Sequence, residues 1–333
     1  MARAAAREHP EAREFPETRM RVGPTIRGDG LRVSMLVGPW MNGPDGVPTA
    51  GSLGVILDDA VGVEVHNHRP AGTHSVTTEL ALDIIVPPPW SGPELLATSR
   101  VAGVGPADGV SRAEIRAGDG QLVAIGTGRS RFVPAEGMHA AAAALELDPP
   151  PRVTPADHRD LLEVLGVADL AGALTFDPDL TADAEIARQH AVSPIPAPRP
   201  SAEAPPLAAR PNGSAGAAVA VLQASVASLA VPPVEAFGNA SGTMHGGLLL
   251  TCSDLAAAAL AGALTSSPAA DYSTSVRMNL LRPAVLTAPV IFTASVVHRG
   301  RALSVYRVTS HGPAGKPYTV ATITRAARPD QGR

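Results

Sequence analysis

A short stretch near the last third of the chain has the residue types and spacing of a site that activates a carbonyl group. Asn239 is followed six residues later by His245, then by Gly246 and Gly247, and Asp254 comes nine residues after the histidine. The run LLLTCSDLAAAALAGAL after the glycines contains no proline and predicts a buried helix. Unpaired N–H groups and the positive end of the dipole at such a helix start favour a carbonyl oxygen that gains negative charge.

This combination resembles the motif of hotdog-fold acyl-CoA thioesterases of the phenylacetate-pathway type, in which an Asn, a His-Gly-Gly turn and an Asp follow one another at this spacing. The resemblance implies an α+β fold in which a curved antiparallel sheet wraps one long central helix. It also implies that two units pair edge to edge. Each active site would then combine the helix start of one unit with the acid from the helix of the other.

The motif region occurs twice along the chain. Shifting the sequence by 196 residues places Gly51 on Gly247 and Asp58 on Asp254 without a gap, and turn prolines align further on. We therefore predict two hotdog units that form an intramolecular pseudo-dimer. Their central helices are expected near 51–65 and 245–263.

Two composite sites follow from the resemblance, and they differ in completeness. The first would consist of Asn239, His245, Gly246 and Gly247 with Asp58 and a hydroxyl from Thr77 or Thr78. The second would consist of Thr49, Ala50 and Gly51 with Asp254 and a hydroxyl from Ser273 or Thr274. Because the second site has lost its His and Asn, we expect the first to be the productive one.

The resemblance also assigns roles in thioester hydrolysis. The Gly246 N–H would polarise the carbonyl, which is typically worth a few kcal/mol. Asp58 would act as base or nucleophile, and general-base help contributes roughly 10²–10⁴-fold. Asn239 and His245 would fix the loop and the thioester. Taken alone, His245 is better explained as a loop residue bonded to backbone groups, and Asp58 as a solvated helix residue. Asp254 lies among apolar residues, so we expect it to be buried. A buried carboxylate needs a partner or a function.

Three functions compete at this point. The first is an acyl-CoA thioesterase, and the second is a hotdog protein that binds acyl-CoA or acyl groups without hydrolysis. The third is a double-hotdog enoyl-CoA hydratase, which ranks last because its Gly-Asp-x-Asn-Pro-x-His type of motif is missing. No cofactor is expected beyond the CoA part of the substrate. No metal is expected either, because His66 and His68 lack zinc-like spacing.

Composition supports a two-domain globular protein. The chain has 333 residues, of which 45% are hydrophobic, and this length favours about two domains. A net charge of −4 gives no support for nucleic-acid binding. The single Cys252, expected to be a packed thiol, excludes an intrachain disulfide.

The charged first twenty residues show no signal peptide, and Asp254 makes the apolar run too polar for a membrane span. We expect a cytoplasmic protein with a small-molecule acyl-CoA partner and no membrane partner. The sequence leaves open whether such chains form homo-oligomers.

The expected organisation has four parts. These are a flexible leader over 1–30, an N-terminal unit over 31–134, an Ala/Pro-rich linker over 135–210 with a short helix near 155–166, and a C-terminal unit over 211–328. Strands are expected near 31–37, 76–86, 94–104, 110–116 and 121–133, and near 219–229, 273–282, 289–299, 302–310 and 316–325. Arginines follow the last strand of each unit, at 129, 131, 325 and 328. Protection of the sheet edge is the default interpretation, and contact with CoA phosphates is the alternative.

Overall fold

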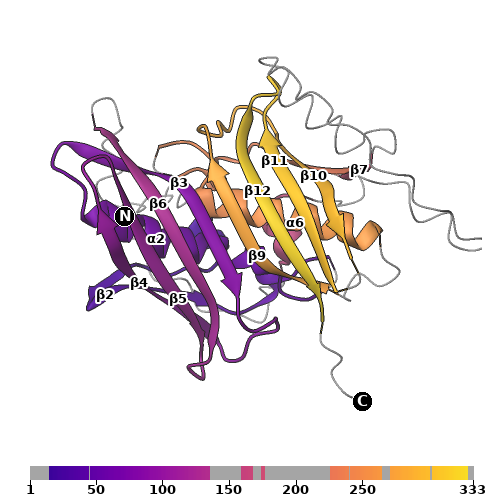
Figure 1. Ribbon diagram of the computed structural model, residues 1–333, viewed down its shortest axis with the longest axis horizontal. Coiled ribbons are helices and arrows are strands. Elements are labelled where there is room, and N and C mark those ends of the chain that lie inside the picture. The colour runs from indigo at the N-terminus through magenta and orange to yellow at the C-terminus, as the bar shows by residue number, and fades with distance from the viewer. Residues whose placement is uncertain are drawn as a thin grey trace, which may run out of the picture.

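The computed structural model describes residues 15–44, 46–135, 159–167, 174–176, 226–239, 241–264, 271–300 and 302–328. Its strands form one continuous 12-stranded sheet in the order β1-β2-β4-β5-β6-β3-β9-β12-β11-β10-β8-β7 (Figure 1). The strands of the first half are β1 Ile26–Gly28, β2 Gly30–Leu36, β3 Thr73–Ile84, β4 Glu94–Val104, β5 Asp108–Ala117 and β6 Leu122–Pro134. Those of the second half are β7 Leu174–Phe176, β8 Val226–Val231, β9 Asp271–Leu280, β10 Val290–Arg299, β11 Leu303–His311 and β12 Pro317–Ala327.

Each half of the sheet wraps one long helix, as the sequence predicts. The order β2-β4-β5-β6-β3 packs around α2, Gly54–Asn67, and the mirrored order β9-β12-β11-β10-β8 packs around α6, Gly246–Ala263. The two halves join through antiparallel pairing of β3 with β9, where Leu80 faces Met278. The prediction of two hotdog units paired within one chain is confirmed.

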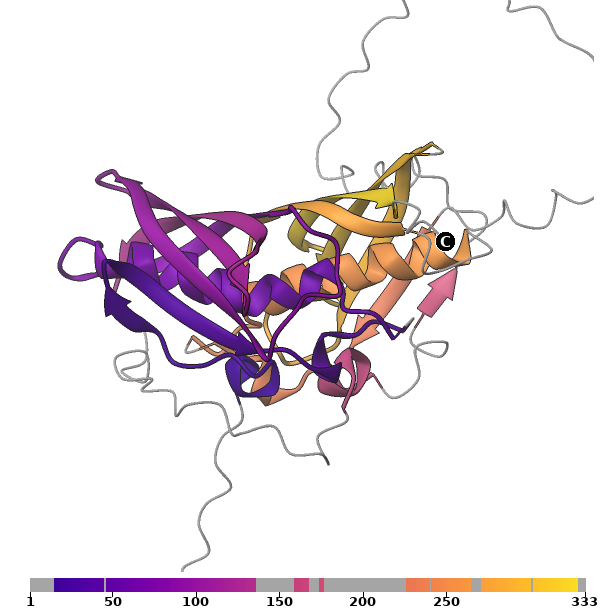
Figure 2. The ribbon, with the colours of Figure 1, turned by 90° about the horizontal axis from the view of Figure 1, so that it is seen from below.

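Both central helices are largely buried, because each packs against its own half-sheet and contacts the other helix. Figure 2 shows both helices on the same face of the sheet, meeting near its middle. Helix α6 is long and apolar enough to cross a membrane, but 78% of it is buried inside the fold. Such burial is typical of the core helix of a soluble protein.

Glycines allow the two helix starts to touch. A Cβ added to Gly247 would lie 2.5 Å from the carbonyl oxygen of Gly54, and one added to Gly54 would lie 2.2 Å from the carbonyl oxygen of Gly247. The helix starts are capped differently. The His245 side chain accepts from the Gly247 N–H, whereas Thr49 caps the short 3₁₀ helix η2, Ala50–Leu53, that leads into α2. The glycines therefore bring the N-terminal ends of α2 and α6 into backbone contact.

Residues 15–30 belong to the N-terminal unit, so the flexible leader expected over 1–30 is wrong for them. A short helix, α1, spans Pro16–Arg19, and Met20 and Val22 after it are buried. Val22 also forms a bridge with Met35 of β2. The abundance of charged residues conceals these two apolar anchors in the sequence. Residues 1–14 lie outside the described part.

The expected linker contains two described elements. Helix α3, Leu161–Val164, begins at Asp160, which forms a capping box with Glu163. The part of the expected short helix before residue 159 lies outside the described residues. So does the part of the strand expected near 219–229 that precedes residue 226. Strand β7, which the sequence did not predict, pairs with β8 at the end of the sheet. The N–H of Leu161 donates to the carbonyl of Asn42, so α3 contacts the N-terminal unit.

Candidate active site

Two carboxylates at matched positions of the central helices are held in the same way. In the first, which we call the Asp58 centre, the Gly247 N–H donates to Asp58 Oδ2 at 2.9 Å. The Thr77 hydroxyl donates to Asp58 Oδ1 at 3.0 Å. The acid lies on α2 and the N–H donor on α6, so both units contribute to this centre.

The second, the Asp254 centre, repeats this arrangement with the units exchanged. The Gly51 N–H donates to Asp254 Oδ2 at 2.7 Å, and the Ser273 hydroxyl donates to Asp254 Oδ1. Gly51 and Ser273 are the residues that the 196-residue offset relates to Gly247 and Thr77. Each carboxylate therefore accepts a backbone N–H from the helix start of the other unit.

Two of the expected hydroxyls and the expected amide make other contacts. Thr78 donates to the carbonyl of Arg129 and Thr274 to that of Thr324, so each bonds to the neighbouring strand. A β-bulge at this place in both strands separates the two neighbouring hydroxyls. Asn239 Oδ1 accepts from the N–H groups of Ser241 and Thr243, at 2.9 and 3.2 Å. Asn239 therefore shapes the loop before His245 and contacts neither carboxylate directly.

His245 lies in a buried acidic cluster at the Asp58 centre. Its Nε2 is 3.2 Å from Asp59 Oδ1 and 3.7 Å from Glu17 Oε1, and its Nδ1 is 3.4 Å from Asp58 Oδ2. Only 6% of His245 is exposed. The sequence did not identify Glu17 or Asp59 as members of this centre, because only the fold brings α1 and α2 against the start of α6.

Burial and charge act in opposite directions on this imidazole. Burial lowers the pKa of His245, but the hydrogen bond to Asp59 and the charges of Asp58, Glu17 and Asp59 outweigh it and raise that pKa to about 10. Burial, followed by the charge of Glu17, raises the pKa of the Asp59 carboxyl to about 7. When His245 is cationic, its Nδ1 carries a proton and no longer accepts from the Gly247 N–H, which then donates to Asp58 alone. Asp58 and Asp59 then both lie against a positive charge.

Arg325 supplies the positive charge at the Asp254 centre. Its guanidinium donates to Asp271 Oδ1 at 2.8 Å and to the Ser273 hydroxyl at 2.7 Å, and lies 4.0 Å from Asp254 Oδ1. Arg325 is only 7% exposed. Protection of the sheet edge and contact with CoA phosphates, the two roles considered from the sequence, therefore do not fit Arg325. Its guanidinium pairs with acids inside the fold. Ser130 occupies the equivalent place in the N-terminal unit, opposite Thr77.

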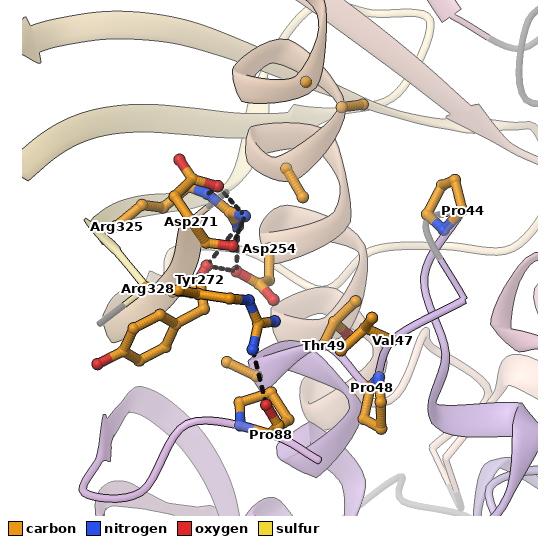
Figure 3. Close-up of a pocket in the computed structure, with 15 residues that line it drawn as sticks. Pro44, Val47, Pro48, Thr49, Pro88, Asp254, Asp271, Tyr272, Arg325 and Arg328 are labelled. Atoms are coloured by element: carbon orange, nitrogen blue, oxygen red, sulfur yellow. Dashed lines mark hydrogen bonds and ion pairs between the residues drawn. The ribbon is translucent and has the colours of Figure 1, made fainter. Parts of the chain in front are cut away.

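A pocket opens at the Asp254 centre, between the two units (Figure 3). Its volume is about 200 Å³. The N-terminal unit contributes Pro44, Val47, Pro48, Thr49, Ala50 and Pro88. The C-terminal unit contributes Asp254, Ala258, Ala259, Gly262, Asp271, Tyr272, Ser273, Arg325 and Arg328. The cavity thus has a buried carboxylate and two arginines on one side and small apolar residues on the others.

The Asp58 centre has no room for a side chain at Gly246. A Cβ added to Gly246 would lie 2.5 Å from Asp58 Oδ2 and 3.3 Å from the Leu280 side chain. Glu17, from the segment that the sequence assigned to a flexible leader, lies against His245. The sequence favours this centre because it keeps the full motif, whereas the pocket described here adjoins the other centre.

The histidine pair considered from the sequence forms separate contacts. His66 Nδ1 lies 2.9 Å from the Ser75 hydroxyl, and the His66 ring meets the His74 ring edge-on at 5.0 Å. His68 Nδ1 lies 2.9 Å from the carbonyl oxygen of Glu64. Within the described residues, neither belongs to a group of three close metal-ligating side chains.

Comparison with known proteins confirms the resemblance to hotdog-fold thioesterases. Residues 241–313 match the thioesterase superfamily, which covers the start of α6 and Asp254. Acyl-CoA thioesterase II TesB2 from Mycobacterium marinum superimposes with a TM-score of 0.52 at 11% identity, over 95% of this chain and 98% of that one. The TesB protein of Mycobacterium avium subsp. paratuberculosis gives 0.51 at 11% identity, over 92% and 96%. No curated protein sequence matches the chain.

These similarities establish the hotdog fold and show that residues 241–313 resemble the thioesterase superfamily. At such identities the structural likeness carries the fold alone, and the family match covers part of the C-terminal unit. The finer resemblance to the phenylacetate-pathway type stays a prediction.

Proposed function

We propose that this double-hotdog protein hydrolyses acyl-CoA thioesters, and that it does so in the pocket beside Asp254. The observation that carries the proposal is a cavity of about 200 Å³ with a buried carboxylate in its wall, at the helix-start position where the fold can polarise a carbonyl. Perturbed or buried carboxylates in pockets are candidates for chemistry. The Asp58 centre, which keeps the His-Gly-Gly motif, is the second candidate.

Asp254 is the group that drives the attack on the thioester carbon. Gly51 and Ser273 each donate a hydrogen bond to its carboxylate, and the charge of Arg325 lies 4.0 Å away. These contacts fix the side chain in one orientation and compensate its negative charge in the interior. The carboxylate either removes a proton from water or attacks the carbonyl itself. General-base help of this kind is worth roughly 10²–10⁴-fold.

The start of η2 supplies the carbonyl-polarising donor. Ala50, the first residue of η2, lines the pocket, and the first N–H groups of a helix have no acceptor within it. Ala50 also corresponds to Gly246 under the 196-residue offset. A donor that faces the developing oxyanion typically contributes a few kcal/mol to the barrier. The missing imidazole at Thr49 does not remove this backbone group.

The pocket suits the acyl end of the substrate. Asp254, Ala258 and Gly262 are spaced by four residues and lie on one face of α6. The pocket wall next to the carboxylate therefore consists of small residues. A cavity of about 200 Å³ is below the ~300–1,000 Å³ of typical small-molecule pockets, so the CoA portion would lie outside it. Arg328 lines the pocket, donates to the carbonyl of Pro88 and lies over the Tyr272 ring. Its guanidinium is the group that would bind a CoA phosphate.

The test compares two isosteric variants of the matched acids. Release of free CoA from a panel of acyl-CoAs, followed with a thiol reagent, should show kcat reduced at least ~100-fold in Asp254→Asn. Asp58→Asn, its control at the equivalent position, should keep most activity. The opposite ranking would assign the chemistry to the Asp58 centre.

A second experiment addresses the non-catalytic alternative. If purified wild-type protein released no CoA from any substrate but bound acyl-CoA in calorimetry, the protein would be a binding module. Single turnover in ¹⁸O-labelled water then separates the two chemical roles of Asp254. Label in the Asp254 carboxylate would indicate a covalent anhydride that water opens at the Asp254 carbonyl. Label only in the released acid would indicate that water attacks the acyl carbonyl.

A further inference from the structure

A second group of chemically competent side chains lies away from the pocket. Glu17, Asp59 and His245 come from three different segments, α1, α2 and the residue that begins α6. Their exposed fractions are 9%, 8% and 6%. One ligand atom from each lies within 4.8 Å of the other two. The fold therefore gathers two carboxylates and an imidazole in its interior.

Two carboxylate oxygens of this group have no hydrogen-bond partner. Glu17 Oε2 and Asp59 Oδ2 are both buried and both unpaired within the described residues. Buried polar atoms almost always have a partner, and an unpaired buried carboxylate oxygen is costly. Since the neighbouring oxygens of the same carboxylates face His245, the bare lone pairs belong to the same cluster.

The excess of negative charge also indicates a missing cation. Asp58 Oδ2 lies 3.4 Å from His245 Nδ1, so three carboxylates surround one imidazole. When all three carboxylates are ionised, even a fully cationic imidazole balances only one of them. A divalent cation would balance the remaining charge, and it could take either oxygen of each carboxylate as a ligand.

The distances fit metal ligation. Ligands at 2.0–2.2 Å from a tetrahedral ion lie ~3.4 Å apart. His245 Nε2 is 3.2 Å from Asp59 Oδ1 and 3.7 Å from Glu17 Oε1, one on each side of that value. With Nε2 on the metal, Nδ1–H would face Asp58, the usual arrangement in which a carboxylate orients a ligating histidine. In that state Nδ1 no longer accepts from the Gly247 N–H, which donates to Asp58 alone.

We propose that Glu17, Asp59 and His245 bind one divalent transition-metal cation, with Zn²⁺ as the best match to an imidazole and two carboxylates. The ion fastens the N-terminal segment onto the crossing of α2 and α6. It would thereby close the Asp58 centre and leave the Asp254 pocket as the accessible one. The sequence could not predict this site, because Glu17 lies far from the His-Gly-Gly motif along the chain.

The test measures metal rather than activity, so it is independent of the proposed hydrolysis. The full-length chain is freed of metal with a chelator, incubated with ZnCl₂, passed over a desalting column and analysed for zinc. We expect one zinc per chain, and calorimetry should show the same stoichiometry. Glu17→Gln and Asp59→Asn should each weaken binding by at least the ~10–100-fold that loss of an outer-shell partner causes.

The control is Glu114→Gln, which removes a carboxylate that is 41% exposed and pairs with Arg116. Its zinc content should equal that of the wild type, and circular dichroism should show that all variants are folded. Two results would overturn the proposal: no zinc retained by the wild type, or binding that neither Glu17→Gln nor Asp59→Asn weakens. Either would leave the cluster as a charge network around a protonated His245.

Discussion

Ala81 of β3 faces Arg277 of β9 across the strand pair that joins the two halves of the sheet. These two residues are also related by the 196-residue offset of the internal repeat. The pseudo-twofold axis of the chain therefore passes between them. From this central position, Arg277 Nη2 donates to both carboxylate oxygens of Asp83 in the other unit, at 2.7 and 2.9 Å. The axis relates the Asp58 and Asp254 centres. Their environments differ because the residues at symmetry-related positions differ between the two units.

Removal of Arg325 should destabilise the whole chain. Arg325→Met leaves the buried Asp254 and the partly buried Asp271 without their counter-charge, and loss of the partner of a buried charge typically costs about 3–5 kcal/mol. Urea unfolding should show this loss in the free energy of unfolding. The matched control is Arg277→Met, since that arginine is 48% exposed and its pair should contribute about 1 kcal/mol or less. Equal losses in the two variants would contradict the assignment of Arg325 as a buried structural cation.

Gly247→Ala should disturb the crossing of the central helices. Its Cβ would meet the Gly54 carbonyl oxygen and Val55 Cα, both at 2.5 Å, so the backbones must separate. Overpacking of this kind costs about 1–3 kcal/mol. Thermal unfolding should show a lower Tm for this variant than for Gly103→Ala, whose added Cβ meets no atom within 4 Å. A Gly247→Ala protein as stable as the wild type would mean that the helix starts are not in close contact.

Filling the pocket should impair catalysis without unfolding the protein. Ala258→Leu places a larger side chain against the cavity wall beside Asp254, so we expect KM for acyl-CoA to rise about tenfold or more, a loss of ~1.4 kcal/mol of binding. Steady-state kinetics with the best substrate of the panel would measure it. Ala263→Leu, at an exposed position of the same helix outside the pocket, is the control. Unchanged kinetics in Ala258→Leu would indicate that substrate binds elsewhere.

Stability should fall in mild acid because of His66. Burial, followed by the charges of Arg69, His74 and Arg27, lowers the pKa of His66 from 6.5 to about 4. The unfolded chain therefore binds a proton between these values that the folded chain does not, and stability decreases as the pH falls from about 6.5 towards 4. Urea unfolding at pH 7 and pH 5 should show a smaller decrease in His66→Gln than in the wild type. An identical decrease in both proteins would exclude this contribution.

Much of the architecture is readable from the sequence because local signals agree with one another. The internal repeat, the apolar helices after glycine turns and the alternating strands predict the double-hotdog fold and most element positions. The hydroxyl partners of both acids follow from the same offset, which relates Thr77 to Ser273. These features depend on short-range sequence patterns, and the internal repeat makes each pattern visible in both halves of the chain.

The environment of each acid could not be read in the same way. Arg325 reaches Asp254 only because β12 pairs with β9, and it has no arginine counterpart at Ser130. Glu17 joins His245 through the packing of α1, whose neighbouring sequence is rich in charges. The motif therefore identifies both acids, whereas long-range packing decides which one adjoins a cavity.

Each acid accepts an N–H from the other unit, so the two centres share one helix crossing but no side chain among the contacts described above. In a homodimer of identical units, any substitution would appear at both centres at once. Joining the units in one chain removes that constraint, because Thr49 and His245, or Leu255 and Asp59, can change separately. One centre can then accumulate acidic residues while the other keeps an open cavity. A covalent connection between the units thus allows a division of labour that symmetry would forbid.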